Sequence, residues 1–101
     1  MEVVVVSRHK STIKLLKQYF PEAKVIGHLS NPNDIPSGSL VIGNLPIETV
    51  AELLKRGCRF VSVVLNIPPE LRGKELGEEE LSRYMKLVEI QELKLSEFII
   101  S

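Results

Sequence analysis

The residues best suited to chemistry stand together near the start of the chain, in the run Ser7, Arg8, His9 and Lys10. An arginine guanidinium presents a planar pair of donors that fits a phosphate group. A histidine imidazole titrates near neutral pH, so His9 is able to donate or accept a proton. Together these residue types predict an anion-binding site with a proton-transfer group beside it.

A buried strand has to hold this polar run in place. Residues 2–6 are almost wholly apolar, which is typical of a central strand covered by helices on both faces. The helix expected next begins at a cap on Ser11 or Thr12 and ends at Pro21. Its apolar positions recur at helical spacing, at Ile13, Leu16 and Tyr19 or Phe20. The polar run therefore joins a rigid strand to a helix N-terminus.

The rest of the chain alternates between apolar strands and helices. Further strands are expected at 23–29, 40–44, 59–67 and 86–93, and further helices from Pro46 to Gly57 and at 78–85. This order, β-α-β-β-α-β-α-β, predicts an α/β fold. We expect one Rossmann-like domain over residues 1–101, with a mostly parallel sheet of about five strands and flanking helices. The apolar tail SEFII at 96–100 is expected to be an edge strand or a subunit contact.

Polar residues gather where the expected strands end. Ligands of open α/β sheets bind outside the carboxyl ends of the strands. Beyond the first strand and its polar run, these ends carry His28 on the second strand, Gly43 and Asn44 on the third, and Asn66 on the fourth. Parallel strands bring such ends to one edge, and the free N–H groups of the helices that follow favour an anion there. Gly43 would let the backbone approach the ligand closely.

Each of these residues also has a purely structural interpretation. Arg8 and Lys10 would be surface charges just past a strand, and His9 would be a cap or a packing group. His28 would have a role at the edge of a loop, and Asn44 would be a helix cap. Arg72 and Gly73 would form a simple turn.

Composition excludes several classes of function. The formal net charge of zero removes the usual argument for a general DNA or RNA binder. Cys58 is the single cysteine, so neither an internal disulfide nor a thiolate metal cluster can form. The two histidines are far apart and no acidic cluster lies at the expected site, so we expect no metal. Without a G-x-G-x-x-G or Walker motif we expect no cofactor. No signal peptide or membrane span is recognisable, which favours a cytoplasmic protein without membrane partners.

Five short segments carry a resemblance: VVSRH at 5–9, HL at 28–29, VIGNLP at 41–46, RG at 56–57 and PPELRGKEL at 68–76. In this order and spacing, over nearly the whole chain, they resemble the Csx proteins numbered sixteen, a small CRISPR-associated family found beside type III systems. That family is similar to the CARF-type domains, which bind cyclic oligoadenylates, the ring-shaped alarm signals of type III systems. The resemblance therefore implies a CARF-like domain that reads such a ring or destroys it.

The resemblance also implies an activity. We expect no effector domain beyond the α/β unit, and a bare ring-binding domain has no output unless it removes the signal, which favours a ring nuclease. Cyclic tetra-adenylate is the expected substrate. A 2′-OH would attack the neighbouring phosphate without a metal and leave linear products with a 2′,3′-cyclic phosphate. His9 would protonate the leaving oxygen and Arg8 would stabilise the charge on phosphorus. A two-fold symmetric ring implies a homodimer. The expected ligand-binding residues are Ser7, Lys10, Ser11, His28, Gly43, Asn44, Leu45 and Arg72.

Three other functions stay open on the sequence. The domain would sequester the ring without cutting it, dock on a CRISPR complex without binding a nucleotide, or act as an unrelated enzyme of nucleotide metabolism that prefers a mononucleotide. Turnover of excess ring separates the nuclease from the sequestering module. A missing thermal shift with every cyclic oligoadenylate would identify the docking protein.

Overall fold

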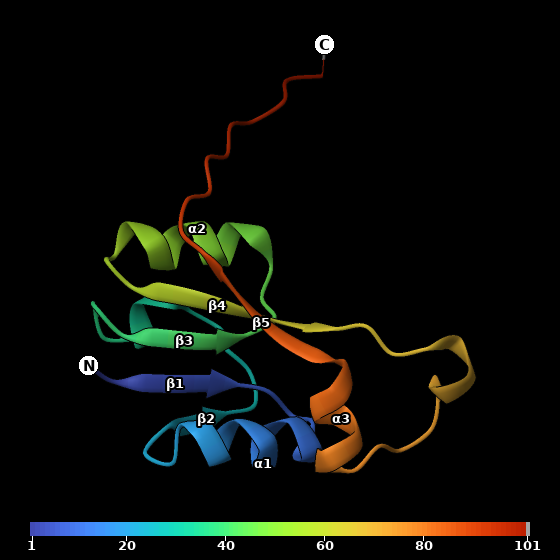
Figure 1. The fold of residues 1–101 in the computed structure, drawn as a ribbon. Helices are drawn as coiled ribbons and strands as arrows, with labels where there is room; N and C mark the ends of the chain where they lie inside the picture. The colour runs from blue at the N-terminus through green and yellow to red at the C-terminus, as the bar shows by residue number, and fades with distance from the viewer. Residues whose placement is uncertain (101) are drawn as a thin grey trace.

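A computed structural model describes residues 1–100 as a five-stranded sheet with helices on both faces (Figure 1). The strands are β1 (Val3–Val6), β2 (Lys24–Ile26), β3 (Leu40–Gly43), β4 (Arg59–Leu65) and β5 (Met85–Ile90). The helices are α1 (Lys10–Tyr19), α2 (Ile47–Lys55) and α3 (Glu78–Tyr84), with short 3₁₀ turns η1 (Pro32–Asp34) and η2 (Pro69–Leu71). The expected α/β class and the expected order of elements are confirmed.

The strand order of the sheet is β2-β1-β3-β4-β5. The first four strands are parallel, and β5 pairs with β4 in the antiparallel sense. The chain moves from β1 outward to β2 and then crosses back to β3 on the other side of β1. This reversal creates a crevice at the carboxyl ends of β1 and β3, which is where open α/β sheets bind ligands.

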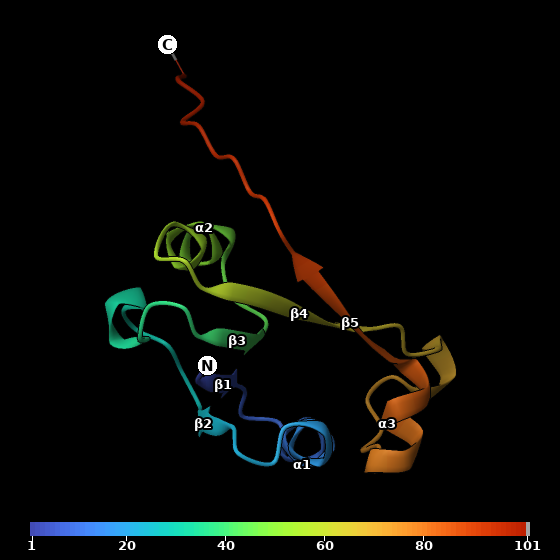
Figure 2. The same cartoon turned by 60° about the vertical axis from the view of Figure 1, so that its left-hand side comes forward.

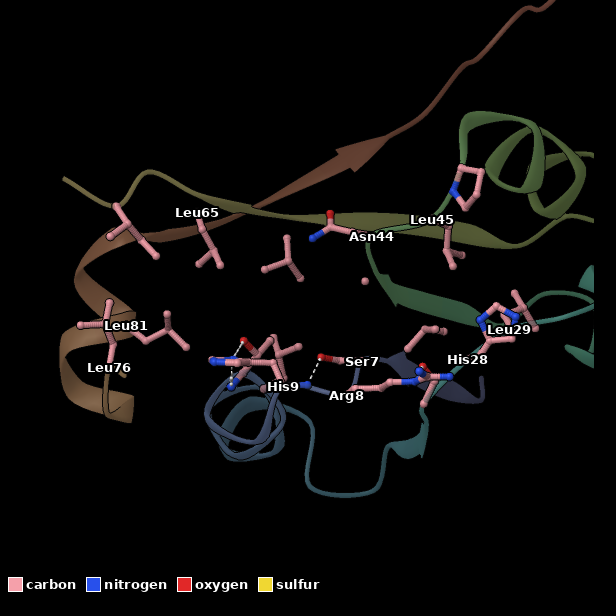
Figure 3. A pocket seen from close by; sticks show the side chains of 18 of the residues that line it. Ser7, Arg8, His9, His28, Leu29, Asn44, Leu45, Leu65, Leu76 and Leu81 are labelled. Atoms are coloured by element: carbon pink, nitrogen blue, oxygen red, sulfur yellow. Dashed lines mark hydrogen bonds between the residues drawn. The ribbon is translucent and has the colours of Figure 1, made fainter. Parts of the chain in front are cut away.

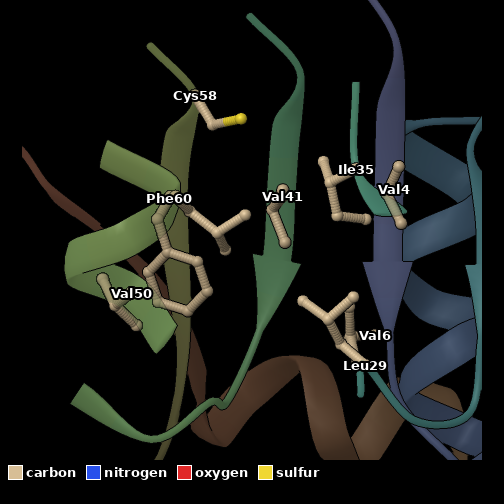
Figure 4. Close-up of a cluster of buried hydrophobic side chains, with 9 residues drawn as sticks. Val4, Val6, Leu29, Ile35, Val41, Val50, Cys58 and Phe60 are labelled. Atoms are coloured by element: carbon tan, nitrogen blue, oxygen red, sulfur yellow. The ribbon is translucent and has the colours of Figure 1, made fainter. Parts of the chain in front are cut away.

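The valine run of β1 is continuous because both faces of the sheet are covered. Val5 packs with Leu16 of α1, on the face that α1 and α3 share (Figure 2). Val4 and Val6 point the other way, into a cluster with Val50 of α2 (Figure 4). Since neighbouring strand residues face opposite sides, a strand buried on both sides needs an apolar residue at every position.

Helix α1 starts earlier than the sequence predicts. Its N-cap is His9, whose backbone is extended and whose Nδ1 accepts the N–H of Thr12. The expected cap on Ser11 or Thr12 is wrong, because the imidazole already occupies the capping position and Thr12 is buried in the first turn. Tyr19, one of two candidates for the last apolar position, is 68% exposed.

The other differences lie at the ends of elements. Strand β2 is three residues long where seven were expected, since Gly27 and His28 already belong to the exposed turn that follows it. Helix α2 begins after Pro46, which is its N-cap rather than a residue of its first turn. The tail at 91–100 pairs with no strand of the described chain and extends away from the sheet (Figures 1 and 2). The sheet ends at β5 on this side and at β2 on the other, and a subunit contact of the tail stays a prediction.

A two-point ion pair fixes β5 to β4. Arg59 donates from Nε to Oε2 of Glu89 at 2.9 Å and from Nη2 to Oε1 at 2.7 Å. These charged hydrogen bonds, supported by the attraction between the charges, lower the pKa of the Glu89 carboxyl and raise the pKa of Arg59. The ion pair joins residues 30 positions apart in the chain. It adds a side-chain contact to the pairing of β4 with β5, the one antiparallel strand of the sheet.

Candidate ligand-binding site

A cavity of about 540 Å³ opens at the carboxyl ends of the parallel strands (Figure 3). This volume falls within the range of roughly 300–1,000 Å³ that is usual for ligand pockets. The cavity is lined from the ends of β1, β2, β3 and β4, and a further wall comes from residues 74–81. It therefore lies at the crevice that the strand order predicts.

Most of the site residues expected from the sequence meet in this cavity. Those that line it are Ser7, Arg8, His9, His28, Gly43, Asn44 and Leu45. Three expected residues, Lys10, Ser11 and Arg72, are not among the lining residues. Lys10 and Ser11 begin the first turn of α1, which turns Thr12 to the cavity instead. Arg72 is exposed and donates from Nε to the carbonyl of Ile67 at 3.3 Å.

The cavity is also lined by residues that the sequence analysis did not name as site residues. Thr12 and Thr49 come from the first turns of α1 and α2, and Lys74 comes from the connector before α3. The apolar wall is made largely by Leu65, Ile67, Leu76 and Leu81. The position of each threonine in the first turn of a predicted helix was the sequence signal that could have placed it at the cavity. The wall at 74–81 has no local signal, because its position depends on how α3 packs against α1.

His9 is held by two contacts through one ring nitrogen. Its Nδ1 lies 2.7 Å from the hydroxyl oxygen of Thr12 and accepts the backbone N–H of Thr12 at 3.3 Å. The backbone N–H of His9 donates in turn to the hydroxyl of Ser7 at 3.2 Å. Because Nδ1 is engaged with the helix, Nε2 is the ring nitrogen left for a ligand. The imidazole thus caps α1 and still keeps one nitrogen for chemistry.

Arg8 is anchored at one of its donors. Its Nε donates to the carbonyl of Gly27 at 3.2 Å, which ties the end of β1 to the end of β2. A Cβ on Gly27 would lie 3.4 Å from the Arg8 side chain, an ordinary contact, so Arg8 packs directly against this part of the chain. One edge of the guanidinium is thereby fixed, and its terminal N–H groups suit an anion such as phosphate.

Asn44 is oriented from the neighbouring strand. The hydroxyl of Ser62 on β4 donates to Oδ1 of Asn44 at 3.2 Å. The amide nitrogen of Asn44 is therefore directed toward the cavity, as Figure 3 shows. Pro46 is the N-cap of α2, and no side chain caps that helix by a hydrogen bond. The interpretation of Asn44 as a helix cap is wrong, and its N–H₂ group is a donor for a ligand.

Gly43 has a structural function in addition to the one expected at the cavity that it lines. It pairs with Val6 in the sheet and is buried. A Cβ at this position would lie 2.5 Å from the backbone carbonyl oxygen of Val6. The close approach that this glycine permits is between β1 and β3, and it brings the two strand ends of the site together.

The electrostatics of the cavity are one-sided. All of its ionisable lining residues are basic: Arg8, His9, His28 and Lys74. No carboxylate is among the residues that line it. The N-termini of α1 and α2, which begin next to the cavity, add partial positive charge. With an amide donor on Asn44 and an apolar wall, the cavity suits an anion attached to an apolar group.

The described residues 1–100 contain neither a group of metal-binding side chains nor a membrane-spanning helix. Within 1–100, no three His, Cys, Asp or Glu side chains are grouped so as to hold a metal ion. The helices of this part of the chain are all too short or too polar to cross a membrane.

Comparison with known families gives one match. Residues 4–94 match the family model described as "Putative CRISPR-associated protein (Cas_VVA1548)". The chain belongs to the Cas_VVA1548 family. The match begins in β1 and ends after β5, so it includes every strand end that lines the cavity. No curated protein and no solved structure matches the chain. The expected association with CRISPR is confirmed by membership of the Cas_VVA1548 family.

Proposed function

We propose that this protein is a ring nuclease that binds and cleaves cyclic oligoadenylate, with cyclic tetra-adenylate as its substrate. The observation that carries the proposal is the exclusively basic set of ionisable residues around a partly apolar cavity at the sheet's crevice. A cyclic oligoadenylate has both matching parts, since its phosphates are anions and its bases are flat and apolar. Membership of a CRISPR-associated family supports the proposal, because type III CRISPR systems make such rings.

The proposed reaction uses the ligand's own nucleophile. A ribose 2′ oxygen forms a bond to the neighbouring phosphorus, and the bond from phosphorus to the 5′ oxygen breaks. The 2′-OH proton passes to water, and the 5′ oxygen takes a proton from Nε2 of His9 in its doubly protonated form. Terminal N–H groups of Arg8 and the amide of Asn44 bind the phosphate oxygens as negative charge develops on them. The products are linear and end in a 2′,3′-cyclic phosphate.

The size of the ring supports a proposed homodimer. One cavity of about 540 Å³ has the size of a pocket for a single small ligand, and a ring of four nucleotides extends beyond it. A two-fold dimer presents the same set of donors twice to a two-fold symmetric ring. The homodimer and the ring therefore form one proposal, in which each protomer binds part of the ligand.

The decisive experiment is a turnover assay. Purified protein is mixed with an excess of cyclic tetra-adenylate or cyclic hexa-adenylate in EDTA, and the products are separated by chromatography. We expect linear products with a cyclic phosphate end, and a rate that falls about 10²–10⁴-fold in His9→Ala, the usual contribution of a positioned proton donor. His9→Ala keeps most of its affinity for the ring because Arg8 and Asn44 remain.

The other outcomes point to other functions. Arg72→Ala is the control variant, since this exposed arginine does not line the cavity and its loss should leave the rate unchanged. Binding without turnover would identify a module that sequesters the ring. A protein that shows no thermal shift with either ring would be a docking protein, or an enzyme for a mononucleotide.

A further inference from the structure

Thr12 is a buried polar residue whose hydroxyl faces the one histidine of the proposed reaction. Its side chain is 6% exposed, and its hydroxyl oxygen lies 2.7 Å from Nδ1 of His9. Thr12 lies between the cavity, which it lines, and the next turn of α1, where Leu15 and Leu16 are buried. A buried hydroxyl at this distance from a ring nitrogen fixes how the ring is turned.

The backbone N–H of Thr12 determines which ring nitrogen carries the proton when His9 is neutral. This N–H donates to Nδ1 at 3.3 Å, so Nδ1 carries a lone pair and the ring proton resides on Nε2. The hydroxyl of Thr12 donates to the same nitrogen in that state. An Nε2–H group is then directed away from the helix, and Nε2 is the only ring nitrogen free to reach a ligand.

The doubly protonated ring needs a different partner. Its Nδ1–H requires an acceptor, and a backbone N–H cannot supply one. The hydroxyl of Thr12 can, because a hydroxyl both donates and accepts. The same oxygen therefore serves the ring before and after it gains a proton, while the backbone N–H serves only the neutral ring.

We propose that Thr12 is a positioning residue for His9, presenting Nε2 to the ligand and accepting the Nδ1–H bond when the ring is doubly protonated. This inference rests on the proposed ring nuclease. In the reaction, His9 gives its Nε2 proton to the 5′ oxygen, while its Nδ1–H stays on the ring and donates to the Thr12 hydroxyl. The proton that the 2′-OH released to water then returns to Nε2, which restores the doubly protonated ring.

The test compares Thr12→Val, which removes the hydroxyl at nearly constant volume, with Thr12→Ser, which keeps it. We expect Thr12→Val to lower kcat about 10–100-fold, the usual effect of losing a partner that orients a functional histidine. KM and affinity for the ring should change less than about threefold. Thr12→Ser should recover most of kcat, which a loss of packing alone does not predict. Thermal unfolding of both variants checks that they are folded.

Nitrogen-15 NMR of the ligand-free parent gives a readout that does not depend on cleavage. At about pH 9, where imidazole is neutral, the spectrum should show His9 as the Nε2–H tautomer. An Nδ1–H tautomer would overturn the positioning role whatever the activity. A parent that cleaves and a folded Thr12→Val that cleaves equally fast would overturn it while the ring nuclease stands. If the parent cleaves no ring, the proposed function fails, and the tautomer alone decides whether Thr12 orients His9.

Discussion

Replacing Gly43 by alanine should destabilise the protein strongly, because the new methyl group has nowhere to go. The added Cβ would lie 2.5 Å from the carbonyl oxygen of Val6, while ordinary contact begins at 3.4 Å. The two atoms must therefore separate by about 0.9 Å. The oxygen is a backbone atom of β1, and the new Cβ is attached rigidly to the backbone of β3, which pairs with β1. No side-chain rotation therefore relieves the contact.

The expected cost follows from that geometry. Overpacking a well-filled core costs about 1–3 kcal/mol, and a clash with two rigid strands falls at the upper end of this range. For a chain of this size, about 3 kcal/mol corresponds to a fall in Tm of roughly 12–24 °C. Thermal unfolding followed by circular dichroism measures this directly, and urea unfolding gives the free energy of unfolding independently.

Gly77→Ala is the matched control. It makes the same chemical change where no heavy atom lies within 4 Å of the new Cβ and where φ is −75°. We expect its free energy of unfolding to change by less than about 1 kcal/mol, the scale of a substitution at an exposed helix cap. A folded Gly43→Ala with the Tm of the parent would refute the reasoning, since it would mean that β1 and β3 separate at no cost.

Three further predictions concern binding, pH and assembly. Arg8→Ala should weaken the affinity for cyclic tetra-adenylate by about 1–3 kcal/mol, the scale of lost charge-assisted hydrogen bonds; unchanged affinity by calorimetry would place the phosphate elsewhere. Because the pKa of Glu89 is lowered in the folded state, its pair with Arg59 stabilises the fold above the ordinary carboxyl pKa of 4.5 and loses this effect as the pH falls through the lowered value. Glu89→Gln should therefore lower the urea midpoint at about pH 6 and differ less from the parent below about pH 4; an equal difference at both pH values would contradict this. Light scattering should give a homodimer, and a mass near 11.4 kDa at micromolar concentration would contradict the proposed assembly.

Local pattern was enough to predict the framework of the fold. The valines of β1 have the residue type and run length of a strand buried on both faces, and they are buried on both. The second helix was expected to end at Gly57, and just past α2 this glycine has a left-handed φ of +79°. Such features depend on a few adjacent residues, so the chain specifies them without reference to distant contacts. The rule that ligands bind at the carboxyl ends of parallel strands predicted that the ends of β1, β2 and β3 lie at one cavity, and they do.

Two parts of the site depend on information that local pattern lacks. The first is the cap of α1, where preference for hydroxyl and amide caps pointed to Ser11 or Thr12. His9 holds the position instead, as the structural alternative of a cap for this histidine allowed. An imidazole nitrogen accepts a hydrogen bond as a hydroxyl does, but its orientation depends on the Thr12 contacts. The second is the wall at 74–81, which α3 carries into place from far along the chain.

The part of the apolar wall at 74–81 is specified by packing rather than by a strand end. Leu76 and Leu81 are buried against Leu15 of α1, and Gln18 donates to Glu78 at 2.7 Å across 60 positions of sequence. Since α1 also carries His9 at its N-terminus, one helix positions both the proposed proton donor and part of the apolar wall beside the cavity. In the proposed function, the strand ends that a simple topology rule locates would bind the phosphate. The apolar part of the proposed ligand would lie against the contact between α1 and α3, which exists only once the whole domain has folded.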